Sequence, residues 1–186
     1  MPDLSPPLPV LESERLRLRP LRADDVDGVF ALYSSPEVTR FWSFAAWTER
    51  AQAEAWLAER IHWGPPSVYL WAVADRRDDR FIGTASLFAL AGPMHRAELG
   101  YSLLPDRQGQ GLATEAVRLA LAHAFGRMGL ERIEADVDPR NEPSWRLLEK
   151  LGFRREGLLR NRWRVGGELA DSLIFGLLRD EYAGAA

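Results

Sequence analysis

The stretch Gln108-Gly109-Gln110-Gly111-Leu112-Ala113 decides the fold, because it stands where a strand pattern ends and a helix pattern begins. Upstream, over residues 98–104, apolar side chains alternate with polar or small ones, which is the period of a strand. Downstream, apolar residues recur at helical spacing, at Ala113, Ala116, Val117, Ala120, Leu121 and Ala124. The sequence therefore predicts a strand, a glycine turn and an amphipathic helix in immediate succession.

The glycine turn is suited to binding an anion. Gly109 and Gly111 lack a Cβ, so a ligand can approach the backbone closely, and the first N–H groups of a helix favour negative charge. A P-loop would need a different spacing and a lysine, and Thr114 stands where a dinucleotide-binding turn needs a third small residue. Two interpretations stay open: a phosphate site built from main-chain amides, or a helix that simply begins at a glycine turn.

Helices alternate with strands along the rest of the chain, which predicts an α/β or α+β fold with a mixed sheet. Strands are expected at residues 15–19, as an edge strand, and at 68–74, 81–90, 98–104 and 133–137, and Gly166-Gly167 is expected to join two final strands as a hairpin. Helices are expected from Asp24 to a stop at Ser35-Pro36, from a cap at Thr48 to about Ile61, and at 113–124 and 143–151. We expect residues 1–10 to be a flexible tail and residues 11–186 to form a single domain.

Composition excludes several classes of function. A net charge of -3 gives no broad basic field for nucleic acid. The chain has no apolar run of roughly 18 residues, and no basic then apolar leader opens it, so we expect a cytoplasmic protein without a membrane partner. Without cysteine there are no disulfides or thiolate ligands, and the three histidines lie far apart in sequence, so no metal site is expected.

The chain resembles the GNAT superfamily of N-acetyltransferases. Gln108-x-x-Gly111-x-Ala113 matches its acetyl-CoA-binding Q/R-x-x-G-x-G/A motif. Glu98-Leu99-Gly100-Tyr101, residues 109–116 and the segment from Asn141-x-x-Ser144 to Phe153 look like its RimJ/RimL-like branch, and the similarity spans roughly residues 14–182. The resemblance implies a mixed, mostly antiparallel sheet flanked by helices, in which two strands splay apart to admit acetyl-CoA.

The resemblance also assigns residues to acetyl-CoA, the implied co-substrate. Leu103 and Leu104 would offer backbone groups to the pantetheine arm between the splayed strands. Asn141 and Ser144 would meet the same arm from the opposite side. The pyrophosphate would be held by the turn and the first helical residues: Gln108, Gly109, Gln110, Gly111, Leu112, Ala113 and Thr114.

Two side chains are expected to move protons. Ser144 would protonate the departing thiolate while Asn141 orders the arm; the alternative is that both are ordinary helix-start residues beside Pro143. Glu98 is the expected base, receiving a proton from the amine through water, and its alternative is a solvated carboxylate on the strand face.

The acceptor follows from amine chemistry. An α-amine has a pKa of about 7.7 to 8.0 and a lysine about 10.4, so an α-amine is far more often neutral at pH 7. We therefore expect transfer to a primary amine, with a protein or peptide N-terminus as the leading acceptor. A small amine such as an aminoglycoside, polyamine or amino-acid derivative is the alternative substrate, and a non-catalytic acyl-CoA-binding module is the alternative class.

Several expectations about the acceptor side stay open. Trp42, within the aromatic stretch of residues 40–47, and Tyr101 are candidate substrate residues, although both residue types are also common in cores. Asp171 is assigned either to ligand contact or to strand pairing. The protein is expected to be a monomer or a homodimer, and the final hairpin offers a surface for pairing across a dimer.

Overall fold

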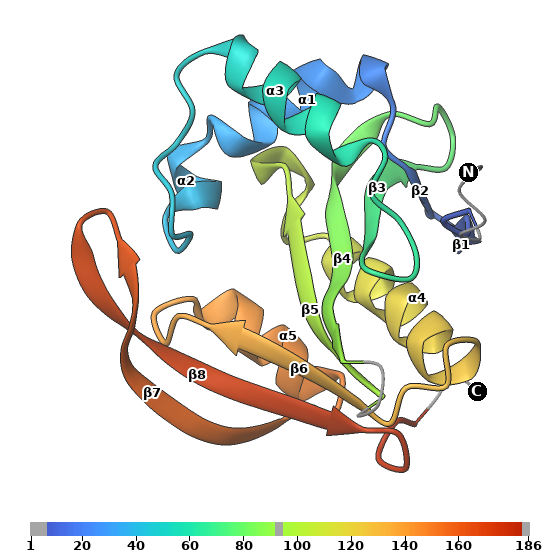
Figure 1. Ribbon diagram of the computed structural model, residues 1–186, viewed down its shortest axis with the longest axis vertical. Coiled ribbons are helices and arrows are strands. Elements are labelled where there is room, and N and C mark those ends of the chain that lie inside the picture. The colour runs from blue at the N-terminus through green and yellow to red at the C-terminus, as the bar shows by residue number, and fades with distance from the viewer. Residues whose placement is uncertain (1–6, 92–94, 184–186) are drawn as a thin grey trace.

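An eight-stranded sheet forms the centre of the computed structural model, which describes residues 7–91 and 95–183 (Figure 1). The strands lie in the order β1-β2-β3-β4-β5-β6-β8-β7, and each neighbouring pair is antiparallel except β5 and β6. The expected mixed, mostly antiparallel sheet is therefore confirmed. The strands are β1 (Leu11–Glu12), β2 (Leu16–Pro20), β3 (Tyr69–Asp75), β4 (Phe81–Ala91), β5 (Arg96–Leu103), β6 (Arg132–Val137), β7 (Arg154–Val165) and β8 (Glu168–Leu178).

Helices cover both faces of the sheet. α4 (Leu112–Gly126) and α5 (Glu142–Lys150) contribute to one buried cluster, and α1 (Val26–Tyr33) and α3 (Arg50–Arg60) contribute to the other. Figure 1 shows α4 running diagonally across the sheet. The short helices are η1 (Ala23–Asp25), α2 (Pro36–Thr39) and η3 (Pro105–Arg107).

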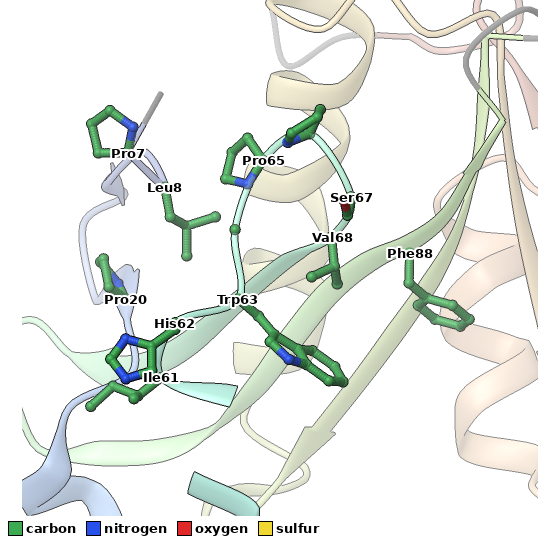
Figure 2. Close-up of a pocket in the computed structure, with 12 residues that line it drawn as sticks. Pro7, Leu8, Pro20, Ile61, His62, Trp63, Pro65, Ser67, Val68 and Phe88 are labelled. Carbon is green, nitrogen blue, oxygen red and sulfur yellow. The ribbon is translucent and has the colours of Figure 1, made fainter. Parts of the chain in front are cut away.

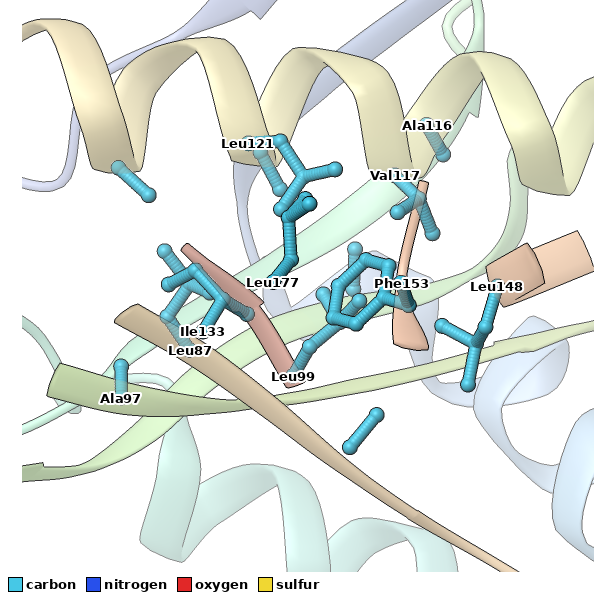
Figure 3. Close-up of a cluster of buried hydrophobic side chains, with 14 of the residues drawn as sticks. Leu87, Ala97, Leu99, Ala116, Val117, Leu121, Ile133, Leu148, Phe153 and Leu177 are labelled. Atoms are coloured by element: carbon cyan, nitrogen blue, oxygen red, sulfur yellow. The ribbon is translucent and has the colours of Figure 1, made fainter. Parts of the chain in front are cut away.

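The side chains of β3 alternate between the two faces of the sheet, and this explains why there are two buried clusters. Trp71 and Val73 pack into the cluster that contains α4, whereas Leu70 and Ala72 pack into the cluster that contains α1 and α3. Successive side chains of a strand point to opposite faces, so a strand covered on both sides is apolar throughout. Figure 3 shows the first cluster beneath α4, where residues from four strands, two helices and the residue before β7 meet: Leu87, Leu99, Val117, Leu121, Ile133, Leu148, Phe153 and Leu177.

Two expectations near the N-terminus are wrong. Thr48 does not cap α3, because the helix begins after Glu49 and the Gln52 side-chain oxygen accepts hydrogen bonds from the Thr48 and Glu49 amides at 2.9 and 3.0 Å. The strand expected at the sheet edge is β2, and the two-residue strand β1 pairs along its outer side. The expected helix stop is confirmed, since α1 ends at Tyr33 and Ser35 begins α2.

The ends of the chain fit the sheet in specific ways. Leu8 packs against the α4 cluster, and the Pro9 carbonyl accepts a hydrogen bond from Trp71 Nε1 at 2.8 Å. Residues 1–6 of the expected tail lie outside the described residues. Gly166 and Gly167 have φ values of 58° and 88°, the left-handed conformation that a two-residue hairpin turn needs, so the expected final hairpin is confirmed.

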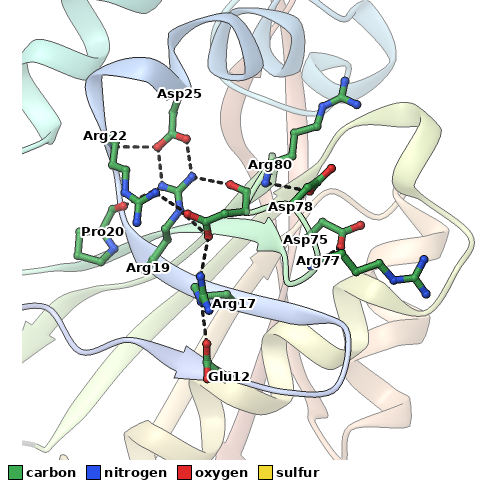
Figure 4. A network of polar contacts seen from close by, with 11 residues as sticks. Glu12, Arg17, Arg19, Pro20, Arg22, Asp25, Asp75, Arg77, Asp78 and Arg80 are labelled. Carbon is green, nitrogen blue, oxygen red and sulfur yellow. Dashed lines mark hydrogen bonds and ion pairs between the residues drawn. The ribbon is translucent and has the colours of Figure 1, made fainter.

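A buried ion pair fastens β2 to the segment before α1 (Figure 4). Arg19 is 2% exposed and Asp25 is 4% exposed, and two hydrogen bonds of 2.8 and 2.7 Å join the guanidinium to the carboxylate. Asp79, in the turn between β3 and β4, accepts further hydrogen bonds from Arg17, Arg19 and Arg22. One charge network thus holds β2 and the segment before α1 to the distant turn between β3 and β4.

Candidate active site

β5 and β6 splay apart at the centre of the sheet. They pair in parallel only at Arg96↔Arg132, Ala97↔Ile133 and Glu98↔Glu134. Beyond Glu98, β5 continues beside β4 and β6 continues beside β8, and these described portions do not pair with each other. A cleft of about 350 Å³ opens there. Its lining includes Phe41, Trp42, Phe88, Glu98, Tyr101, Asp136, Asp138, Asn141, Ser144 and Trp163.

The backbone of β5 offers the cleft one donor at its end. The Leu104 amide donates to the Ile82 carbonyl and the Leu104 carbonyl accepts from the Arg107 amide, both at 2.9 Å. Because backbone groups alternate between the two edges of a strand, the Leu103 N–H points away from β4 and toward the splayed side. The expectation that Leu104 also offers a backbone group is therefore corrected: it extends the ladder to β4.

The glycine turn has the geometry of an anion cradle. Gly109 and Gly111 have φ values of 70° and 76°, a left-handed conformation that favours glycine. Gly111 precedes α4 directly, and the helical hydrogen bond at its carbonyl comes from the Glu115 amide at 3.1 Å. The amides of Leu112, Ala113 and Thr114 are the first-turn donors of the helix, which a bound anion can satisfy.

The side-chain amides of the two exposed glutamines brace the turn. Gln108 Nε2 donates to the Leu103 carbonyl at 3.0 Å, and Gln110 Nε2 donates to the Asp106 carbonyl at 2.8 Å. A Cβ built on Gly109 would meet no atom within 4 Å, so the approach to the turn is open. The residues therefore fit a phosphate that is held by main-chain donors.

A second set of contacts, which we call the Arg15 clamp, joins the turn between β1 and β2 to this cradle. Arg15 donates to the Gln110 carbonyl at 3.0 Å and to Glu115 Oε2 from Nε at 2.7 Å. Ser13 Oγ donates to Glu115 Oε1 at 2.6 Å. The clamp neutralises a carboxylate in the first turn of α4, where an anion would otherwise meet like charge.

Ser144 and Tyr101 meet across the cleft. Their hydroxyl oxygens are 2.8 Å apart, and Tyr101 Oη is also 3.3 Å from the Ser144 carbonyl oxygen. Burial raises the pKa of Tyr101 to about 12, although the hydrogen bond with Ser144 opposes this, so the phenol keeps its proton at neutral pH. Asn141 precedes α5 but its side chain makes no capping hydrogen bond, and it lines the cleft with Ser144.

Glu98 lies half-buried where the splay begins. Burial, and then the nearby Glu134 carboxylate, raises the pKa of Glu98. Glu134 itself is paired with Arg96 at 2.5 Å and with Arg132 at 2.8 Å. The Glu98 carboxylate thus has a raised proton affinity and access to the cleft, the properties that a base requires.

The other carboxylates of the cleft are held by fixed partners. Asp136 accepts a hydrogen bond from Trp163 Nε1 at 2.9 Å and another from the Ser172 hydroxyl. Burial raises the pKa of Asp138, but hydrogen bonds from Arg140 outweigh that effect and lower it overall. Asp136 and Asp138 are thus engaged by their partners, whereas Glu98 has a raised pKa.

The aromatic stretch of residues 40–47 contributes both to the lining of the cleft and to a buried cluster. Phe41 and Trp42 line the cleft. Phe44 and Trp47 pack on the buried Tyr33, with ring centroids 5.7 and 5.0 Å from the tyrosine ring, and the Trp42 ring also packs edge-on to Tyr33 at 5.9 Å. This part of the chain supplies both a wall of the cleft and a core.

The final hairpin contributes a residue that sequence reasoning missed. Trp163 on β7 lines the cleft beside Asp136. The signal was available as a single tryptophan within an arginine-rich segment, but its position depends on pairing with β8. Asp171 on β8 accepts a hydrogen bond from the Asn161 amide at 2.9 Å, which favours strand pairing over ligand contact for that residue.

A second depression lies beside the loop that follows α3 (Figure 2). It is lined mostly by proline and apolar side chains, together with His62 and Ser67. It shares Phe88 with the cleft but lacks the carboxylates and the hydroxyl pair found there. The chemistry of the molecule is therefore concentrated in the cleft between β5 and β6.

Over 7–91 and 95–183, no group of three or more histidine, aspartate or glutamate side chains is placed to hold a metal ion. Within the same ranges, no helix is long and apolar enough to cross a membrane.

A splayed strand pair with a main-chain anion cradle at its end defines a transferase that binds a long, phosphate-bearing substrate, and comparison with known proteins identifies the family. Residues 15–154 match the family model of the acetyltransferase (GNAT) domain. The chain is 37% identical to the uncharacterized N-acetyltransferase p20 of Bacillus licheniformis, over 94% of this chain and 98% of that protein. It is 26% identical to the spermidine N(1)-acetyltransferase of Escherichia coli K12, over 90% and 88% of the two chains.

A solved structure agrees with these matches. An acetyltransferase of the GNAT family from Bacillus anthracis superposes with a TM-score of 0.84 at 25% identity, covering 93% of this chain and 100% of that chain. The chain therefore belongs to the GNAT family of acetyltransferases. It is an N-acetyltransferase, and acetyl-CoA is its co-substrate.

Proposed function

We propose that the acceptor is the α-amine of a protein or peptide N-terminus. The observation that carries this proposal is the nature of the base: Glu98 is a carboxylate whose pKa is raised, and the histidines do not line the cleft. A carboxylate is a weak base toward a lysine, whereas an α-amine with a pKa of about 7.7 to 8.0 is already partly neutral at pH 7.

The roles of the residues follow from their positions. Glu98 receives the amine proton through a water molecule as the nitrogen attacks the acetyl carbonyl carbon. The Leu103 N–H stabilises the negative charge that develops on the carbonyl oxygen. As the C–S bond breaks, Ser144 supplies a proton to the sulfur, and Tyr101 holds the serine hydroxyl in place and returns a proton to it from solvent.

The RimJ/RimL-like branch remains our assignment within the family. Its support is the sequence Glu98-Leu99-Gly100-Tyr101, the turn that continues through Thr114-Glu115-Ala116, and Asn141-x-x-Ser144. In the structure these segments all border one cleft and its cradle, as a shared substrate site would require.

A polyamine is the second candidate acceptor. Glu98, Asp136 and Asp138 give the cleft an acidic lining that attracts a polycation, and the Escherichia coli relative is a spermidine N(1)-acetyltransferase. An acidic lining attracts a single α-ammonium group as well, so the two acceptors need to be compared directly.

Matched acceptors provide the test. One peptide has a free N-terminus and no lysine, a second has a blocked N-terminus and one lysine, and spermidine is the third acceptor. Thiol release from acetyl-CoA is followed from pH 6.5 to 9. We expect the free N-terminus to react faster than the lysine by at least tenfold at pH 7, with a smaller difference at pH 9 as more lysine becomes neutral.

The outcomes separate the candidates. A faster blocked lysine peptide at pH 7 contradicts the α-amine assignment. Turnover of spermidine alone moves the assignment to polyamines, and absence of thiol release with every acceptor contradicts both candidates and moves the assignment to another small amine.

A further inference from the structure

Three arginines are next in sequence to residues that line the cleft, and we call them the arginine rim: Arg40, Arg140 and Arg162. Arg40 follows α2 and precedes the lining residue Phe41, Arg140 lies between β6 and α5, and Arg162 on β7 precedes the lining residue Trp163. All three are exposed. Figure 1 shows the tip of the β7–β8 hairpin and α2 on the same side of the molecule, with the end of β6 below them.

The rim is anchored on the aromatic walls of the cleft. The guanidinium carbons of Arg40 and Arg140 lie 5.2 and 5.9 Å from the centroid of the Phe41 ring, so two cations flank one ring. The guanidinium carbon of Arg162 lies 5.4 Å from the Trp163 ring. Because both rings line the cleft, the rim charges stand at its edge.

The charges of the site are arranged in two zones. The lining carries the carboxylates Glu98, Asp136 and Asp138. At the rim, Arg140 is paired with Asp138 at 2.6 Å, and Glu168 at the start of β8 also acts on Arg140. Among the described residues, Arg40 and Arg162 have no carboxylate within ion-pair distance. Arg40 and Arg162 thus supply positive charge without a direct ion pair, and they act over longer distances on Asp138 and Glu98 respectively.

This order of charges suits a substrate with a cation at one end and an anion a short distance along. A polyamine has cations along its whole length, so its outer amines would meet the rim with like charge. An extended peptide rises about 3.3 Å per residue, so a chain whose α-amine lies near the lining residue Glu98 leads its next residues out toward the mouth of the cleft. The side chains of the second and third residues of an N-terminal peptide would then lie at the rim.

We propose that the preferred acceptor is a protein or peptide N-terminus with aspartate or glutamate at its second or third position, whose carboxylate is bound by Arg40 and Arg162. The inference rests on the proposed α-amine acceptor and specifies its sequence. Exposed ion pairs contribute modestly, so each arginine is expected to change selectivity by about two- to fivefold.

Three lysine-free peptides that begin Ala-Asp-Glu, Ala-Gln-Gln and Ala-Arg-Arg, otherwise identical, provide the experiment, with spermidine as a fourth acceptor. We expect kcat/KM to fall in that peptide order by about tenfold from first to last at low ionic strength. The differences in kcat/KM should shrink at about 0.5 M salt. The screening length falls from about 10 Å at 0.1 M salt to about 3 Å at 1 M, so the charges of the rim act over a shorter distance. Arg40→Gln and Arg162→Gln should each lower the ratio of the acidic to the neutral peptide.

Two controls match these variants. Arg40→Lys keeps the charge and should keep most of the preference. Arg127→Gln removes an exposed arginine at the end of α4 and should leave the ratio unchanged. Equal kcat/KM for the three peptides, or a preference that survives Arg40→Gln combined with Arg162→Gln, overturns this inference and leaves the α-amine acceptor standing. Turnover of spermidine without turnover of any peptide overturns both.

Discussion

Single residues determine how the site handles protons, and Glu98 is the first to test. Its pKa is raised by burial and by Glu134, so the carboxylate protonates above its ordinary range as the pH falls. Only the deprotonated form acts as a base. Glu98→Gln should therefore lower kcat/KM by about 100-fold near neutral pH, the lower end of the range for general bases.

The pH dependence distinguishes this role from a structural one. Protonation of the amine slows both enzymes equally, so it cancels in the ratio of wild-type to Glu98→Gln rates. That ratio should fall toward one as the pH drops through the raised Glu98 pKa. A ratio that stays constant with pH would assign Glu98 to packing.

Ser144 and Tyr101 can be tested as a pair. Ser144→Ala should lower kcat by roughly tenfold and leave the KM for acetyl-CoA nearly unchanged, because a thiolate with a pKa of about 8.5 leaves fairly well without an acid. Tyr101→Phe should have a smaller effect, since it removes only the partner of the serine hydroxyl. Steady-state kinetics measure both, and an unchanged kcat in Ser144→Ala would contradict the assigned role.

At the scale of elements, the Arg15 clamp connects the N-terminal strands with the glycine turn. Arg15 holds the Gln110 carbonyl and Glu115 but does not line the cleft. Arg15→Gln should raise the KM and dissociation constant for acetyl-CoA by about fivefold at most, as for other half-exposed ion pairs, and should leave kcat unchanged.

The control for this prediction is Arg118→Gln, which removes an exposed arginine from α4 and should alter neither parameter. Calorimetry with acetyl-CoA supplies the binding constant independently of turnover. A fall in kcat at constant KM would mean that the clamp acts on the reacting groups instead.

Elements governed by local sequence were the ones predicted well. The strand before the glycine turn, helix α4 and the Gly166-Gly167 hairpin follow from short-range periodicity and glycine conformation. Leu104 and Thr48 were assigned wrongly, because their roles depend on the Ile82 carbonyl and the Gln52 side chain. Trp163 was missed because only pairing with β8 brings it beside Asp136. Location in the cell and oligomeric state stay predictions.

For the whole molecule, the buried Arg19–Asp25 pair is expected to matter most among the ion pairs. Asp25→Ala leaves a guanidinium that is 2% exposed without its bidentate partner, which should lower the free energy of unfolding by about 3 to 5 kcal/mol. Urea unfolding measures the change. Asp27→Ala, which removes the exposed partner of Arg50, is the matched control and should change stability little. Equal losses in the two variants would contradict the importance of burial.

The main-chain cradle at Gly111 has a consequence for turnover. It contacts the phosphate-bearing part of acetyl-CoA, which is the same before and after transfer. The cradle therefore contributes equally to the binding of acetyl-CoA and of the product CoA. Such uniform binding lowers KM without speeding the chemical step. Free CoA should therefore inhibit competitively against acetyl-CoA. An enzyme that holds its donor by the unreactive end has to release its product from the same grip.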